Sequence, residues 1–145
     1  MMKSADQQSF PVTRQILREF HQEMRKVKWT KAALILILVR ILDSGTAYLA
    51  FLVDPSRFLK AEVNQDFVLF LTKGDPTNTI LQNTVFVVLP FVMFFLARRS
   101  KQADLGVILF WSMGLFLFVF IFLGSLFATV VNLISTVLWS IEMLW

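Results

Sequence analysis

Residues 105–141 read LGVILFWSMGLFLFVFIFLGSLFATVVNLISTVLWSI and contain no Asp, Glu, Lys or Arg. An uncharged apolar stretch of 18 or more residues is typical of a transmembrane helix. At about 1.5 Å per residue this one exceeds the roughly 30 Å of a bilayer's hydrocarbon. Either one long tilted span ends near Asn132 and an interfacial helix follows, or the chain turns back at Gly124-Ser125. We favour the first, because a tight return needs polar turn residues.

Two further apolar stretches precede this one, so the sequence predicts an all-α integral membrane protein with about three transmembrane helices. The first stretch ends at Asp54-Pro55, and the second ends at Arg98-Arg99. The predicted segments, in chain order, are a basic amphipathic interfacial helix on the cytosolic face (1–31), span one (32–53), an external loop with a short interfacial or re-entrant helix (54–78), span two (79–97), a basic cytosolic loop (98–104), span three (105–134) and a C-terminal interfacial helix (135–145).

The composition agrees with lipid as the main solvent of the chain. Hydrophobic residues make up 57% and charged residues 17%, against about 45–50% and 25% in soluble domains. The absence of cysteine excludes disulfides and thiolate metal sites, and a single histidine excludes a His-pair zinc motif. No nucleophile motif or phosphate-binding glycine loop is present. We therefore expect no enzyme activity, no cofactor and no metal.

A basic cluster precedes span one and consists of Arg25, Lys26, Lys28 and Lys31. Upstream apolar residues recur at spacings of three and four, which is typical of an amphipathic helix on a membrane surface. Cations beside a span favour anionic lipid headgroups as a partner, and we expect no nucleic-acid binding. The alternative is a solvated helix packed on a partner. By the positive-inside rule the N-terminus is cytoplasmic, and three spans leave the C-terminus outside.

Arg40 and Asp43 lie deep in span one. A charge near the bilayer centre costs about 2.5–3.5 kcal/mol on insertion scales, so such residues usually face protein and are paired. Their spacing of three places them on one helical face. We interpret them as an intramembrane polar pair that fixes helix packing. A proton or ion relay and a docking point for a partner helix remain alternatives.

Glu62, Asn64 and Asp66 form a polar cluster that opens the apolar run after the first loop. Acidic and amide side chains at a helix N-terminus favour capping and the helix dipole, so this local role is the default interpretation. If the run is re-entrant, Glu62 could approach Arg40. A hard-cation site from Asp43, Glu62 and Asp66 is the least favoured alternative.

A stripe of small and polar residues in the third segment predicts a helix-packing face. It consists of Gly124, Ala128, Asn132 and Ser135. Its partner is either this protein's own bundle or another chain. Three tryptophans are interpreted as anchors at the membrane–water interface: Trp111, Trp139 and Trp145.

The segment Arg40-Ile-Leu-Asp43-Ser-Gly-Thr46, followed by Glu62-Val-Asn64, resembles a family of small polytopic prokaryotic membrane proteins of unknown function. That family shows an Asp-x-x-Thr pattern in span one and a Glu-x-Asn pattern after it. The resemblance implies several spans over about residues 35–134 and a prokaryotic inner membrane as the location. It implies no activity.

Together these features predict a non-catalytic accessory or structural subunit of a larger membrane complex, or a homo-oligomer. Polar and small-residue stripes inside a membrane call for facing helices. The alternative is a small oligomeric ion or solute conductor that uses the Arg40/Asp43 pair.

Overall fold

The computed structural model describes residues 6–62, 64–101 and 104–145, with side chains described from residue 13 onward. All regular structure among them is helical: α1 (Asp6–Lys26), α2 (Trp29–Val53), α3 (Pro55–Ala61), α4 (Gln65–Lys73), α5 (Thr77–Arg99) and α6 (Leu105–Glu142). Three of these helices, α2, α5 and α6, are long and apolar enough to cross a membrane. Less than a third of each apolar stretch is buried inside the protein. The chain is therefore a multi-pass helical membrane protein whose outer surface suits lipid.

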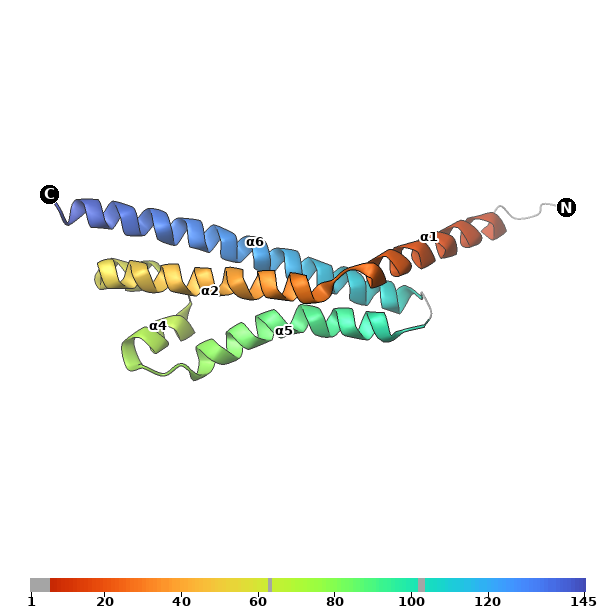
Figure 1. Ribbon diagram of the computed structural model, residues 1–145, viewed down its shortest axis with the longest axis horizontal. Helices are drawn as coiled ribbons and strands as arrows, with labels where there is room; N and C mark the ends of the chain where they lie inside the picture. The colour runs from red at the N-terminus through yellow and green to blue at the C-terminus, as the bar shows by residue number, and fades with distance from the viewer. Residues whose placement is uncertain (1–5, 63, 102–103) are drawn as a thin grey trace.

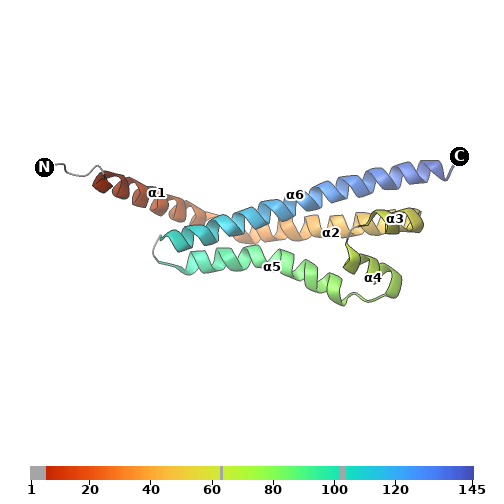
Figure 2. The same ribbon diagram turned by 180° about the vertical axis from the view of Figure 1, so that it is seen from behind.

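Helix α6 organises the bundle, because it lies along both α2 and α5 while those two helices contact each other much less (Figures 1 and 2). It runs unbroken for 38 residues. We expected a change of element after residue 134, and none occurs; nor does the chain turn back at Gly124. The reason is local: the hydroxyls of Thr129, Thr136 and Ser140 each donate to the carbonyl four residues earlier. Polar side chains satisfied in this way do not end a helix.

An aromatic core joins α2, α5 and α6 near the end that carries the N-terminus. Trp111 is fully buried, contrary to our prediction that it anchors the interface. Its ring lies 5.6 Å from that of Trp29 and 5.8 Å from that of Phe94. Gly114 lies one turn further along α6 and allows α5 to come close at Phe94 and Pro90. Trp111 shares the packed face of α6 with Val107 and Gly114, so its position on the helix decides its burial.

At the opposite end, α3 and α4 form a short helical hairpin in which α3 lies beside α2 and α4 lies beside α5 (Figure 2). Asp54 caps α3 by accepting the backbone N–H of Arg57 at 3.0 Å. Phe58 and Phe67 pack with Ala47 and Ala50 in a second core cluster. This hairpin occupies the segment in which we expected one short helix.

Two features fix the ends of this hairpin. Arg57 forms ion pairs with Asp54 and with Glu142 at the end of α6. The hydrogen bond to the Glu142 carboxylate raises the pKa of the Arg57 guanidinium above its ordinary value. Gly74 ends α4 with a φ of 69°, a left-handed conformation that favours glycine. The next residue, Asp75, accepts the backbone N–H of Thr77, which lowers the pKa of its carboxyl.

Helix α1 continues the long axis of the bundle instead of crossing its end (Figures 1 and 2). Phe20 and Met24 pack on the aromatic core, and His21 is buried against α6. These contacts hold the last two turns of α1 in line with α2. The placement of α1 on a membrane surface stays a prediction.

Candidate functional site

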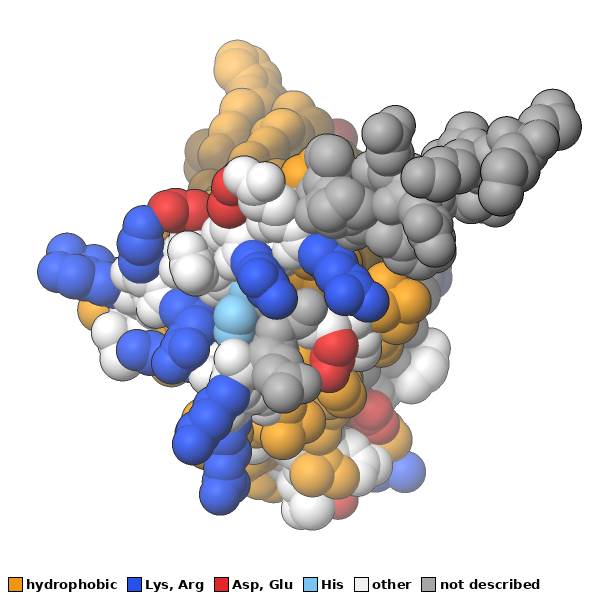
Figure 3. Space-filling view, turned by 90° about the vertical axis from the view of Figure 1, so that its right-hand side faces the viewer, with side chains coloured by type: hydrophobic (Ala, Val, Ile, Leu, Met, Phe, Trp, Pro, Cys, Tyr) orange, Lys and Arg blue, Asp and Glu red, His pale blue; other side chains and the backbone are white. Residues whose placement is uncertain are grey.

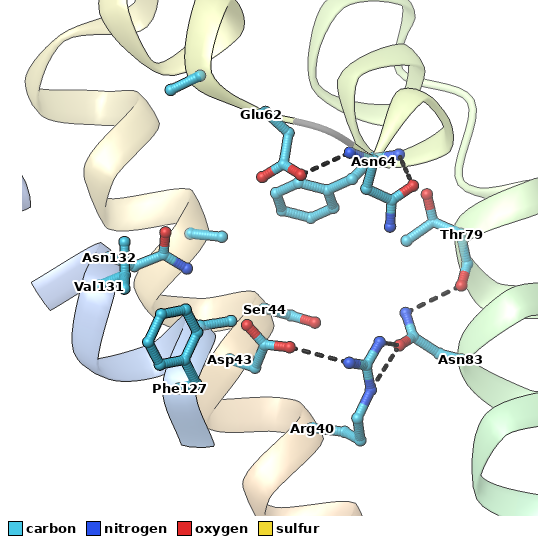
Figure 4. Close-up of a pocket in the computed structure, with 14 residues that line it drawn as sticks. Arg40, Asp43, Ser44, Glu62, Asn64, Thr79, Asn83, Phe127, Val131 and Asn132 are labelled. Atoms are coloured by element: carbon cyan, nitrogen blue, oxygen red, sulfur yellow. Dashed lines mark hydrogen bonds and ion pairs between the residues drawn. The ribbon is translucent and has the colours of Figure 1, made fainter. Parts of the chain in front are cut away.

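Arg40 is the centre of a hydrogen-bond network that joins α2, α5 and α6, and Figure 4 shows its bonds to Asp43 and Asn83. Its guanidinium donates to the Asp43 carboxylate on α2 and to the Ser125 hydroxyl oxygen on α6, each at 2.9 Å. It also donates to the side-chain oxygen of Asn83 on α5. The guanidinium carbon lies 5.8 Å from the ring centroid of Phe86. The Arg40 and Asp43 side chains are 17% and 15% exposed, so the pair is largely enclosed by protein.

A cavity of about 330 Å³ lies next to this network, between α2, α5, α6 and the inner end of the α3–α4 hairpin (Figure 4). Most of its polar lining comes from residues far apart in the chain: Arg40, Asp43, Ser44, Glu62, Asn64, Thr79, Asn83 and Asn132. This volume could hold several water molecules, since one water takes about 30 Å³ of liquid volume.

The members of the polar cluster Glu62, Asn64 and Asp66 have different roles, because Asn64 caps a helix and Glu62 lines the cavity. Asn64 caps α4 by accepting the backbone N–H groups of Asp66 and Phe67 at 3.1 and 3.2 Å. Glu62 accepts the Asn64 backbone N–H at 2.7 Å and lies in the cavity wall. The hairpin thus brings Glu62 to the cavity that Arg40 also lines.

Asp66 takes a different place. Its backbone carbonyl accepts the Thr79 hydroxyl at 2.9 Å, and its side chain is not part of the cavity lining. The alternative cation site from Asp43, Glu62 and Asp66 is therefore not assembled. Across residues 6–62, 64–101 and 104–145, no three His, Asp or Glu side chains gather closely enough to hold a metal.

The structure places the four residues of the predicted α6 stripe in different surroundings. Ala128 and Asn132 line the cavity. Gly124 is exposed with open space around it, and its neighbour Ser125 is 2% exposed and bonds Arg40. Ser135 is half-buried beyond the cavity. The packed face runs through position 125 because it continues from Trp111 and Gly114 in steps of three and four.

Sequence reasoning missed Asn83 and Thr79, the α5 side of the site. The Asn83 amide donates to the Thr79 carbonyl at 2.9 Å, which fixes its oxygen toward Arg40. An amide inside an apolar span was a usable signal, since such groups usually face protein.

A second opening reaches Arg40 from the side. It is a groove of about 460 Å³ between α2 and α5, lined by Ile37, Arg40, Ile41, Ser44, Asn83, Thr84, Val87 and Val88. Its polar lining residues are Arg40, Ser44, Asn83 and Thr84, and the other lining residues are apolar. Arg40 and Asn83 line both the groove and the cavity, so the two openings share these side chains.

The basic cluster lies apart from this centre. Arg25, Lys26, Lys28 and Lys31 are all exposed near the junction of α1 and α2. Figure 3 looks at this end of the molecule and shows Lys and Arg side chains over much of it.

Fold and site define this chain as a multi-pass α-helical membrane protein with an enclosed polar centre and a lateral groove. No family model matches the chain, and no curated protein or solved structure matches it. The resemblance to the small prokaryotic membrane proteins gains no support from these comparisons.

Proposed function

We propose that this protein is a non-catalytic accessory or structural subunit that holds a transmembrane helix of another membrane protein in the groove between α2 and α5. The observation that supports this most is that the charged side chain of Arg40 lines the groove. A guanidinium in contact with acyl chains is costly, and a partner helix would cover it. The small lining residue Ser44 lets a helix backbone approach closely.

The charges suggest what this partner helix presents. The groove presents the Arg40 guanidinium, whereas the carboxylates Asp43 and Glu62 line the neighbouring cavity. A guanidinium can only donate hydrogen bonds. A complementary helix would therefore offer a hydrogen-bond acceptor or an acidic side chain at this depth, because buried charges need partners.

This assignment predicts a specific crosslink. A photo-reactive amino acid at Ile41, which is 62% exposed at the groove, should crosslink in native membranes to another protein. The same label at Phe120 of α6, 69% exposed and outside the groove lining, is the matched control and should crosslink mainly to lipid. Purification of the tagged chain in mild detergent should recover the same partner in fixed ratio.

A small oligomeric ion or solute conductor is the second candidate, favoured by the polar cavity beside Arg40 and Asp43. The same preparation separates the two functions. A pure homo-oligomer that conducts ions in liposomes, with no Ile41 crosslink to a different protein, would overturn the accessory role.

We also propose that the protein resides in a prokaryotic inner membrane with its N-terminus in the cytoplasm, where the basic cluster meets anionic lipids. The positive residues Arg98 and Arg99 lie at the same end as this cluster, which supports the orientation. A topology reporter fused after Trp145 should then read external, as three spans require. A cytoplasmic reading would contradict this arrangement.

A further inference from the structure

A second cavity, of about 770 Å³, lies at the basic end of the molecule between α1 and the start of α6. Charged and polar residues dominate its lining: Arg14, Arg18, Arg25, Lys101, His21 and Asp104. Four cations therefore face one carboxylate. That carboxylate is already engaged, because Asp104 caps α6 by accepting the Val107 backbone N–H at 2.8 Å.

Helix spacing explains how α1 supplies most of this charge. Arg14, Arg18, His21 and Arg25 follow one another at steps of three and four, so they share one face of α1. Lys101 reaches the same cavity from the connection between α5 and α6. In the end-on view of Figure 3, Lys and Arg side chains lie beside and above the pale blue histidine.

His21 carries the second observation. Its Nδ1 accepts the indole N–H of Trp111 at 2.9 Å, and an indole nitrogen can only donate. In the neutral ring the proton then belongs to Nε2, which is a donor. His21 is 4% exposed, and across the described part of the chain its Nε2 has no hydrogen-bond partner. A buried donor without an acceptor is costly, so the site lacks an oxygen that a ligand can supply.

From this geometry we propose that the cavity between α1 and α6 binds a phosphate group. A phosphate supplies several acceptor oxygens and a negative charge, which match the arginines and the imidazole N–H. Arginine binds phosphate with two parallel hydrogen bonds, and three of the four cations are arginines. The group can come from the headgroup of an anionic lipid or from a soluble phosphate. The inference does not depend on the partner-helix assignment.

Because His21 is the sole histidine, selective ¹⁵N-histidine labelling of the full chain in neutral detergent gives one imidazole signal to follow by NMR. Phosphatidylglycerol should shift the Nε2 signal saturably, and phosphatidylcholine should not. Inorganic phosphate is titrated separately, with chloride at matched ionic strength. Saturation by phosphatidylglycerol alone identifies a lipid headgroup. Saturation by inorganic phosphate as well identifies a site that also accepts soluble phosphate.

Arg18→Gln should weaken binding and raise the half-saturating concentration of phosphatidylglycerol by about tenfold, the loss expected for one charge-assisted hydrogen bond. Lys73→Gln removes the same charge on α4, outside both the cavity and the basic cluster, and should change the half-saturating concentration by about twofold or less. Lys101→Gln is the second test variant if Arg18→Gln alters the ligand-free histidine signal. No shift with either probe, or equal weakening by a cavity variant and Lys73→Gln, would overturn the proposal.

Discussion

Replacing Arg40 with leucine is expected to destabilise the bundle by about 3–5 kcal/mol, the cost of leaving buried carboxylates without their cation. Arg40 donates hydrogen bonds to Asp43, Asn83 and Ser125, so its loss removes contacts from α2, α5 and α6 together. The measurement is the free energy of unfolding in detergent, followed by helical circular dichroism during titration with a denaturing detergent.

Two variants make this result specific. Arg40→Leu combined with Asp43→Leu removes both charges of the pair and should recover a large part of the lost stability. Arg99→Leu removes an exposed arginine at the end of α5 and should change stability by about 0.5 kcal/mol or less. An Arg40→Leu protein as stable as the parent would mean that water, and not protein, solvates the polar centre.

Gly114→Ala is expected to cost about 1–3 kcal/mol through overpacking, although the change adds one methyl group. A Cβ at this position would lie 2.6 Å from the Phe94 ring and 3.1 Å from the Pro90 carbonyl oxygen. Phe94 cannot turn aside easily, because it is 2% exposed and stacks on Trp29 at 3.8 Å between ring centroids. The helices must move apart, which also loosens the packing around Trp111.

The matched control is Gly124→Ala on the same helix, where an added Cβ meets nothing within 4 Å. Thermal unfolding of the two variants in detergent compares the positions directly. Only Gly114→Ala should lower the midpoint. Equal midpoints for both variants would contradict the close approach of α5 and α6.

The sequence alone was enough to predict three apolar helices, because lipid imposes a length and a composition on any span. Arg40 and Asp43 were recognisable for the same reason, as charges with no place among acyl chains. The residues that complete the site were not recognisable from the sequence. Asn83 and Ser125 lie 43 and 85 residues from Arg40 along the chain. Periodicity within one helix identifies a face and does not tell which other helix meets it.

Our incorrect predictions for Trp111 and for the end of α6 have a similar cause, since both depend on contacts that the sequence does not show. Trp111 was assigned to the membrane interface by residue type, whereas the burial of the α6 face that it shares with Gly114 depends on α5. The polar residues near the end of α6 were expected to end the span. Their hydroxyls bond within the helix instead, a choice that composition does not reveal.

The position of α6 against both α2 and α5 has a consequence for biosynthesis. Ribosomes make α6 after α2 and α5, so these two helices enter the membrane while they share little contact with each other. Until Ser125 emerges, the Arg40 guanidinium lacks its partner on α6. In a nascent chain at that stage, α6 does not yet cover the Arg40/Asp43 pair. The membrane insertion machinery then has to shield this pair from lipid. Release into lipid is therefore coupled to the arrival of α6.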